Sequence, residues 1–308
     1  MTGVVVACCQ FAPVLGDLAV NRQRSAELVT SAAARGASIV VLPELVSSGY
    51  VFESAAEVSA SAETADGETV TGWARLAAEH GIVIVGGFCE ASGDEVFNSA
   101  ALVDPDGIRS VYRKAHLWND EKRWFSPGSA APPVVATRFG RIAMVICYDL
   151  EFPEWVRLPA LDGAQLLCAP TNWPAAYGRP DGERPAEVVR VQANAAVNRM
   201  FIAACDRTGE ERGVGWVGGS VIVDADGWPL AATGQAAGHN PATVTGGPVT
   251  IAAECQLGEA MDKSIGPKND VHADRRPELY GRVAGPPAPS ATSDHAIDSV
   301  TQSPPPLR

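Results

Sequence analysis

A thiol at the end of a predicted buried strand is the first group in this chain that could do chemistry. Residues 141–146 are nearly all apolar and follow the turn signal Phe139-Gly140, which predicts a short buried strand. Pro153 suits the first turn of a helix, because it has no N–H to donate. Cys147 therefore lies between a strand end and a helix start, where the helix dipole and free backbone N–H groups favour a thiolate. The alternative is that Cys147 is a small hydrophobic filler of the core, as most cysteines are.

Two charged residues elsewhere in the chain would make such a thiol a nucleophile. Glu44 follows Pro43 at the end of an apolar run, and Lys114 ends a predicted strand. An unperturbed carboxylate would take the thiol proton uphill by about 5 to 6 kcal/mol, since the two pKa values differ by roughly four units. Burial raises a carboxyl pKa and a nearby lysine lowers that of a thiol, so the three residues make sense only as a unit. Read singly, Glu44 is a helix cap or half of an ion pair, and Lys114 is a solvated surface residue.

The other candidate motifs are weaker evidence for a functional site. His116, two residues after Lys114, is the nearest alternative base. The seven cysteines form no C-x-x-C pair and the five histidines show no metal-binding spacing, so we expect neither a metal site nor a disulfide framework. Residues 213–218 match G-x-G-x-x-G literally, but a charged loop precedes them and a predicted strand follows. The dinucleotide motif must instead open a helix, so this match does not predict a nucleotide cofactor.

Short apolar strands that alternate with helices must position the candidate residues. Glu44, Cys147 and Asn172 each follow the carboxyl end of such a strand, where ligand sites of α/β proteins gather. Hairpins predicted at 97–114 and 220–231 each turn at an Asp-x-Asp-Gly sequence and suggest two sheets or two related halves. The sequence therefore predicts α/β layers with sheets buried on both faces. The predicted strands are 4–11, 39–42, 82–88, 141–146, 164–168 and 201–205, and the predicted helices are 17–35, 68–80, 153–161 and 184–199.

Composition limits the class of protein. The 308 residues are 46% hydrophobic and 19% charged, so the chain is globular and long enough to bury a full core. A net charge of -12 argues against nucleic acid or an anionic membrane as partner. No apolar run approaches the roughly 20 residues that span a bilayer, and the start lacks the basic region of a signal peptide, so we expect a cytoplasmic protein. Residues 284–308 are rich in Pro, Ser, Thr and Ala, which predicts a disordered tail after a domain of residues 1–283.

Three motifs, in this order, resemble those of the nitrilase superfamily of carbon–nitrogen hydrolases, whose catalytic triad is Glu-Lys-Cys. They are Leu42-Pro43-Glu44, Arg113-Lys114-Ala115-His116-Leu117, and Cys147-Tyr148-Asp149 with Phe152-Pro153-Glu154. The resemblance spans roughly residues 4 to 282 and implies that Glu44, Lys114 and Cys147 are catalytic. Members often carry a second glutamate before an F-x-P-G segment, and Glu121 is the matching position. It would orient the substrate amide or the lysine, whereas without the family Glu121 is one charge in a charged loop.

The resemblance also implies a fold and a reaction. The fold would be an α/β four-layer α-β-β-α sandwich, and members usually pair so that two sandwiches become continuous, which implies a homodimer or a higher homo-oligomer. The reaction would be hydrolysis of a small, aliphatic carboxamide through a cysteine thioester, with no cofactor and no metal. Lys114 and the N–H of Tyr148 would hold the oxyanion. Asn172 is also expected at the substrate, and three aromatic residues would either wall a small pocket or belong to the core: Tyr50, Trp118 and Trp173.

Neighbouring activities are the alternatives. True nitrilases of the superfamily typically have Trp-Glu after the cysteine, whereas this chain has Tyr148-Asp149, which is more like the amidase and carbamoylase branches. An N-carbamoyl amino acid amidohydrolase would need a cation for the substrate carboxylate, for which Arg179 and Arg184 are candidates, although surface arginine is the simpler interpretation. A degenerate member acting as a binding or scaffold protein, or a redox-sensing Cys147, are further alternatives. The intact triad argues against the scaffold.

Overall fold

Two six-stranded sheets form the centre of the part of the chain that the structure describes. The structure is a computed structural model, and it describes residues 3–175, 182–234 and 247–285. The chain divides into two units, Met1–Ala273 and Asp274–Arg308, and the first holds both sheets. Of the second unit only residues 274–285 are described, with the 3-10 turns η4 (Pro277–Leu279) and η5 (Gly281–Ala284). The predicted tail therefore lies almost wholly outside the described residues.

The first sheet has the strand order β14-β1-β2-β3-β4-β5 and the second the order β13-β12-β9-β8-β7-β6. In each sheet the three central strands run parallel, β1-β2-β3 in the first and β7-β8-β9 in the second, and antiparallel strands flank them. The strands of the sheets are β1 (Val4–Gln10), β2 (Ile39–Val41), β3 (Val83–Ser92), β4 (Glu95–Asp104), β5 (Gly107–Arg113), β6 (Val134–Thr137), β7 (Gly140–Met144), β8 (Leu166–Pro170), β9 (Phe201–Cys205), β12 (Val221–Val223), β13 (Pro229–Ala232) and β14 (Val249–Cys255). The short pairs are β10 (Glu210–Glu211) with β11 (Val214–Gly215), and β15 (Ser264–Gly266) with β16 (Asn269–Asp270).

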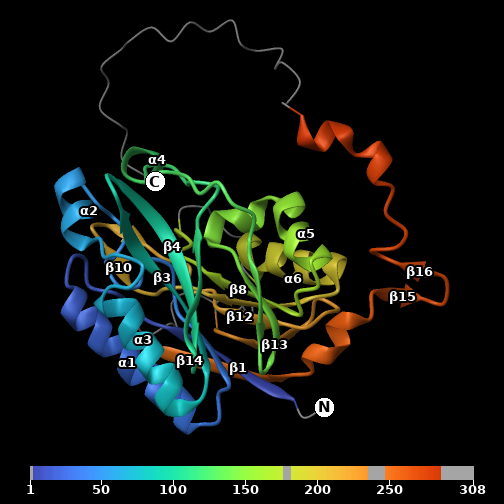
Figure 1. The fold of residues 1–308 in the computed structure, drawn as a ribbon, viewed down its shortest axis with the longest axis horizontal. Helices are drawn as coiled ribbons and strands as arrows, with labels where there is room; N and C mark the ends of the chain where they lie inside the picture. Colours follow the sequence, from blue (N-terminus) through green and yellow to red (C-terminus); the bar gives the residue numbers. More distant parts are fainter. Residues whose placement is uncertain (1–2, 176–181, 235–246, 286–308) are drawn as a thin grey trace, which may run out of the picture. The chain divides into compact units, whose positions relative to one another are not determined.

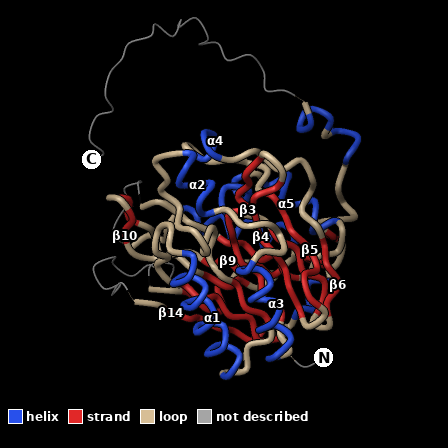
Figure 2. The backbone as a smooth tube through the Cα atoms, turned by 60° about the vertical axis from the view of Figure 1, so that its left-hand side comes forward, coloured by secondary structure: helices blue, strands red, loops and turns tan. Residues whose placement is uncertain are grey.

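Helices cover the outer face of each sheet. Figure 1 shows α1 and α3 on one side of the sheets and α5 and α6 on the other, and Figure 2 shows α1 and α3 lying across the strands. The helices are α1 (Leu18–Ala34), α2 (Ala55–Ser61), α3 (Glu68–His80), α4 (Glu121–Trp124), α5 (Pro153–Leu161) and α6 (Ala186–Asn198), with 3-10 turns η1 (Cys147–Glu151) and η3 (Leu257–Met261). The expected four-layer α-β-β-α sandwich is thus confirmed. None of the described helices combines the length and apolar character that crossing a membrane requires.

Strand β1 shows why the predicted strands are continuous apolar runs and do not alternate between polar and apolar residues. Val6 and Cys8 pack in the core between the two sheets, together with residues of β7, β8 and β9. Ala7 and Cys9 point the other way, into the layer between the first sheet and helices α1 and α3. Because side chains alternate along a strand, both faces of β1 are buried, and neither face tolerates a polar stripe.

Local signals set several element boundaries as predicted. Helix α3 runs from Glu68 to His80, and Gly81 ends it in the left-handed conformation with φ of 66°. Helix α1 is capped by Asp17, whose side chain accepts the Val20 N–H at 3.1 Å. The hairpin predicted at 220–231 is β12–β13, and the one at 97–114 is part of a three-stranded meander, because β3 extends to Ser92 and pairs with β4.

Candidate active site

Four of the predicted site residues lie at the carboxyl ends of strands from both sheets. Glu44 follows β2 and Lys114 follows β5 in the first sheet, while Cys147 follows β7 and Asn172 follows β8 in the second. All four are buried: their exposed fractions are 0%, 1%, 7% and 1%. The side chain of Asn172 joins the two sheets, since its Nδ2 donates to the carbonyl oxygen of Glu44 at 3.0 Å. The packing of the sheets thus assembles the site.

Lys114 is the centre of a buried charge cluster. Its Nζ lies 2.6 Å from Oε1 of Glu44 and 2.7 Å from Oε1 of Glu121. Asn98 Nδ2 donates to the same Oε1 of Glu44 at 2.7 Å. The second carboxylate oxygen of Glu44, Oε2, is buried and has no hydrogen-bond partner among the described residues. One oxygen of Glu44 is therefore fixed, and the other is available to a proton.

Burial controls the protonation of these groups. Burial raises the pKa of Glu44 to about 7, with Lys114 opposing and Glu121 reinforcing the shift. Burial by itself would lower the pKa of Lys114, but the charges of Glu121 and Glu44 outweigh it and the pKa is raised, so the ammonium keeps its proton. Burial and the charge of Glu44 raise the pKa of Cys147 well above its usual value, and Lys114 only partly offsets this. Contrary to the expectation of a lowered pKa, the pKa of the Cys147 thiol is raised, so the thiol keeps its proton. The carboxyl group of Glu44 has a pKa of about 7.

Cys147 occupies an unusual backbone conformation. Its φ is 45°, in the left-handed region that side chains rarely adopt, and Leu45 next to Glu44 has the same φ of 45°. Such a conformation costs about 1–3 kcal/mol per residue and concentrates at functional sites. The sequence predicted Cys147 directly before a helix, but the 3-10 turn η1, which begins at Cys147, precedes the start of α5 at Pro153. The thiol therefore lies at the start of this turn and not at the N-terminus of an α-helix. Its Sγ lies 3.8 Å from the carbonyl oxygen of Asn172.

Gly87 in β3 allows the chain around Glu44 to approach the sheet. A Cβ at this position would lie 2.6 Å from the Cα of Glu44 and 2.6 Å from the backbone N of Leu45. The Gly87 N–H donates to the Pro43 carbonyl at 3.1 Å, and the Gly87 carbonyl accepts from Val46 at 3.0 Å. Any side chain here would displace the Glu44 loop, so a glycine is required by close approach.

Glu121 is buried although it lies in a run of charged residues. The one-turn helix α4 turns its side chain inward, to an exposed fraction of 3%. Its Oε1 accepts from Lys114 and from the Tyr50 hydroxyl, and its Oε2 accepts the Trp118 N–H at 3.1 Å. Burial and the charges of Glu121 and Glu44 raise the pKa of Tyr50 well above its usual value, so the phenol remains a hydrogen-bond donor. Tyr50 thereby joins the charge cluster.

The remaining predicted residues divide between the site's edge and the core. Trp118 and Tyr148 are half-buried and meet edge to face, with ring centroids 4.9 Å apart. Tyr148 also contacts Phe152 at 5.2 Å. Trp173 is 5% exposed and belongs to the large apolar core cluster that includes residues of β7, β8 and β9, while its backbone N–H donates to Asp206 at 3.0 Å. Of the two predicted roles, pocket wall or core, Trp173 therefore fits the core better than Trp118 does.

Sequence reasoning missed two residues that hold the site together. Asn98 contacts Glu44, and its signal was a polar side chain inside the apolar run of β4. Asp149 is fully buried and accepts from the Ile146 N–H at 3.0 Å and from the His116 N–H at 3.1 Å. It also accepts from the Tyr112 hydroxyl at 2.7 Å, and the His116 ring nitrogen Nδ1 lies 2.7 Å from it. Asp149 thus links the segment before Cys147 to the segment after Lys114, and it engages His116, the alternative base.

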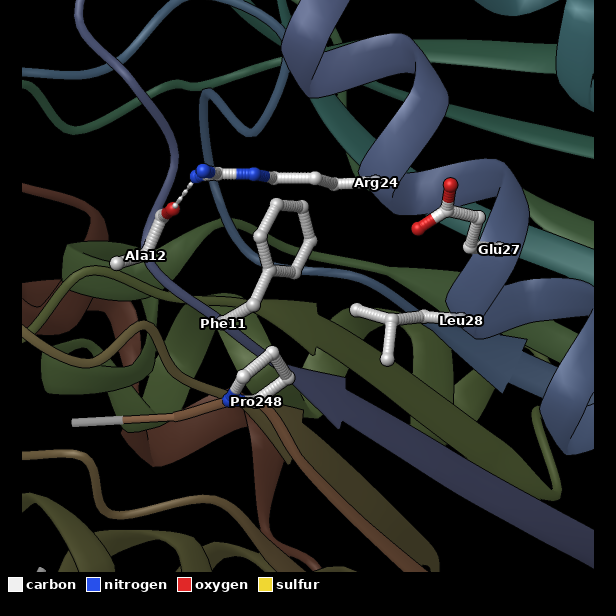
Figure 3. A pocket seen from close by; sticks show the side chains of 6 residues that line it. All are labelled: Phe11, Ala12, Arg24, Glu27, Leu28 and Pro248. Carbon is white, nitrogen blue, oxygen red and sulfur yellow. Dashed lines mark hydrogen bonds between the residues drawn. The ribbon is translucent and has the colours of Figure 1, made fainter. Parts of the chain in front are cut away.

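Neither the arginine side chain considered for a substrate carboxylate nor a cavity beside α1 is part of this charge cluster. Arg184 donates to Gln192 at 2.8 Å, and Arg179 lies outside the described residues. A cavity of about 390 Å³ lies beside α1, where Arg24 donates to the Ala12 carbonyl at 3.1 Å (Figure 3). None of the candidate site residues lines it; its walls are Phe11, Ala12, Arg24, Glu27, Leu28 and Pro248.

Comparisons with known proteins agree on one family. The family model described as carbon-nitrogen hydrolase matches residues 5–260. A protein of Pyrococcus abyssi named nitrilase is 35% identical over 280 residues, which are 91% of this chain and 100% of that one. An (R)-stereoselective amidase of a Pseudomonas species is 33% identical and covers 71% of this chain and 77% of its own length.

A solved structure adds a similarity in three dimensions. It is a mutant of the amidase from Nesterenkonia sp. AN1, at 26% identity and a TM-score of 0.71, and the match covers 91% of this chain and 96% of that one. In that protein the acetamide moiety of fluoroacetamide is covalently added at the active site cysteine. On the family model and on relatives that match over most of their length, this chain belongs to the carbon-nitrogen hydrolase family.

Proposed function

We propose that the chain is an amidase that hydrolyses a small aliphatic carboxamide to a carboxylic acid and ammonia. The observation that carries the proposal is the Glu44 carboxyl group, which has one oxygen held by Lys114 and Asn98 and the other without a partner among the described residues. One oxygen of this carboxylate is fixed by hydrogen bonds, and the other can accept a proton. Its charge also raises the pKa of the Cys147 thiol, so the two groups are close enough to act together in nucleophilic catalysis. The relatives named amidase support the choice of substrate class.

In the first half-reaction, Glu44 takes the proton of Cys147 while the sulfur attacks the amide carbon. Raising the pKa of Glu44 from 4.5 to about 7 makes it a better proton acceptor by about 3 kcal/mol. The thiol pKa is raised as well, so the transfer completes only as negative charge moves from sulfur to the carbonyl oxygen. Lys114 and the N–H of Tyr148 stabilise that oxyanion. Glu44 then returns its proton to the leaving nitrogen, the C–N bond breaks, and ammonia departs from a thioester.

In the second half-reaction, water replaces the amine. Glu44 takes a proton from water, the hydroxide attacks the thioester carbon, and the same two donors hold the second oxyanion. Collapse breaks the C–S bond, the sulfur recovers its proton from Glu44, and the carboxylic acid leaves. Glu121 keeps Lys114 charged and in place, and we propose that it also accepts an N–H of the substrate amide.

Ammonia release from a substrate panel tests this proposal. The panel contains acetamide, propionamide and butyramide, the matching nitriles, ω-amides and N-carbamoyl amino acids, with Cys147→Ala and Glu44→Gln beside the wild type. We expect turnover of the amides, abolished in both variants, with circular dichroism showing that both remain folded. Turnover of nitriles or carbamoyl compounds in place of amides would move the protein to a neighbouring branch of its family. Turnover that survives in Cys147→Ala would refute the mechanism.

We also propose that the protein assembles as a homodimer or a higher homo-oligomer. The outer helices α5 and α6 carry exposed apolar side chains, with exposed fractions of 36% for Leu158, 38% for Leu161 and 51% for Val189. A second copy of the chain would cover them. Sedimentation equilibrium checks this: we expect at least twice the mass of one chain, and Val189→Glu should shift the equilibrium toward the monomer.

A further inference from the structure

A second buried ion pair, between Glu211 and Arg207, binds the loop that carries Tyr50 through hydrogen bonds. Glu211, in the short strand β10, is 7% exposed, and its Oε1 accepts the N–H groups of Tyr50 at 2.8 Å and Val51 at 2.5 Å. Its other oxygen, Oε2, accepts from Arg207 Nη2 at 2.9 Å. Arg207 is itself fully buried. A carboxylate that accepts two successive backbone N–H groups fixes the course of that backbone, and charge-assisted bonds of this kind are the strong ones.

The backbone before Tyr50 is fitted closely to this carboxylate. Gly49 has φ of +81°, and a Cβ there would lie 3.0 Å from Oε2 of Glu211 and 2.8 Å from the Cα of Leu15. A side chain at this position would therefore be both strained and obstructed. Gly49 therefore passes Leu15 and the Glu211 carboxylate too closely for a side chain to fit without displacing them.

The Tyr50 ring is held by an aromatic neighbour that Arg207 also contacts. The ring of Trp216 meets it edge to face with centroids 5.3 Å apart, and the guanidinium carbon of Arg207 lies 4.6 Å from the Trp216 ring centroid. Arg207 thus supports both the carboxylate that holds the Tyr50 backbone and the indole that holds its ring. The hydroxyl then reaches Glu121, which binds Lys114.

We propose that Glu211, held by Arg207, is a positioning residue that acts on the reaction through Tyr50. Its two backbone hydrogen bonds set the Tyr50 hydroxyl on Glu121, and Glu121 in turn keeps the Lys114 ammonium in place for the oxyanion. This inference rests on the proposed function, because it assigns Tyr50, Glu121 and Lys114 to the same reaction. The hydrogen bonds of Glu211 to described residues reach Tyr50, Val51 and Arg207 and not Lys114 or Cys147, so the proposed path to the reaction runs through the Tyr50 loop.

A double-mutant cycle tests the path. Tyr50→Phe keeps the backbone bonds to Glu211 and removes only the hydroxyl, and we expect kcat/KM to fall about 10- to 100-fold, the range for loss of one hydrogen bond to a charged group. Glu211→Ala should cause a loss of about 10-fold or more through displacement of the loop. In the Tyr50→Phe background the further effect of Glu211→Ala should shrink to about 3-fold or less, because the two residues act as a unit.

Two further variants keep the test decisive. Glu211→Gln retains a carbonyl oxygen for the two N–H groups and should recover part of the activity; if Glu211→Ala fails to fold, the cycle is run with Glu211→Gln. Asp104→Asn is the matched control, because Asp104 is 4% exposed and paired with Arg109 at a hairpin far from Tyr50. It should lower the melting temperature with unchanged kcat/KM.

The outcomes separate the two levels of the proposal. Equal effects of the Glu211 change in the wild-type and Tyr50→Phe backgrounds would overturn the positioning role and leave amide hydrolysis intact. A Glu211→Ala variant that, like Asp104→Asn, has a lower melting temperature but an unchanged kcat/KM would overturn the positioning role as well. Absence of any turnover that depends on Cys147 in the wild type would instead refute the proposed function itself.

Discussion

Removal of the Asn98 side-chain donor should move the pH dependence of the reaction. Asn98 Nδ2 donates to Glu44 Oε1 at 2.7 Å, and this hydrogen bond adds to the larger effect of Lys114 in lowering the pKa of Glu44 against burial. Asn98→Leu keeps the side chain close to its original size and deletes the donor. A hydrogen bond to a charged group contributes about 1.5–3 kcal/mol, and one pKa unit corresponds to about 1.4 kcal/mol. The pKa of Glu44 should therefore rise by about one to two units above its value of about 7.

The sign of the effect follows from the proposed role of Glu44 as a base. Only the ionised carboxylate accepts the thiol proton, so kcat/KM rises with pH through the Glu44 pKa and levels off above it. In the wild type this acid limb should lie near pH 7. In Asn98→Leu it should lie near pH 8 to 9, with about 10- to 100-fold less activity at pH 6 and partial recovery at pH 9.

The assay is ammonia release from propionamide between pH 5.5 and 9.5, fitted for the acid limb. Ser99→Ala is the control, because the neighbouring hydroxyl donates to Glu90 and not to Glu44; its limb should stay where the wild-type limb is. A uniform loss of activity in Asn98→Leu with an unmoved limb would refute the reasoning, since Asn98 would then hold geometry and not protonation. A limb that moves toward lower pH would contradict the assigned base.

Three further changes have defined outcomes. Gly87→Ala should lower kcat/KM about 100-fold with the protein still folded, because the new Cβ would displace the Glu44 backbone, from which it would lie only 2.6 Å; wild-type activity with a folded variant would show that the loop has room. Asp206→Asn should change the pH dependence of unfolding by urea. Burial raises the pKa of Asp206 from 3.8 to about 7, so the folded wild type holds a proton that the unfolded chain has lost, and its stability falls as pH rises through this window. The variant does not titrate, so between pH 4 and 7 it should gain up to about 4 kcal/mol relative to the wild type, and a constant difference would contradict this. Truncation after Gly285 should leave amide turnover unchanged, because every candidate site residue lies within Met1–Ala273; a large loss would show that the tail reaches the site.

Elements with both faces buried could be predicted from the sequence, and elements at the margins could not. The strand Phe201–Cys205 and the helix Glu68–His80 were predicted with the boundaries that the structure has. Strands β6 and β14 were not predicted: β6 is an edge strand and most of β14 is only half-buried, so their side chains mix polar and apolar types without a clear period.

The site shows the same division. Glu44 and Cys147 stood out because an apolar strand leads into each of them. The burial of Glu121 could be expected only from the family resemblance, because its neighbours in the chain are charged and the one-turn helix that turns it inward leaves no periodic signal. Asn98 and Glu211 act through partners that are 54 and 160 to 161 residues away in the chain. Such pairings arise from tertiary packing, which no local pattern records.

The division of the site between the two sheets has a consequence for the newly made chain. Glu44 and Lys114 follow strands of one sheet and Cys147 follows a strand of the other, so neither sheet alone holds the proposed nucleophile together with its proposed base. The reactive cluster comes into existence only when the inner faces of the sheets dock and exclude water. An incompletely folded chain therefore presents an ordinary cysteine without a neighbouring carboxyl or ammonium group. Recovery of activity during refolding should accordingly report the docking of the two sheets.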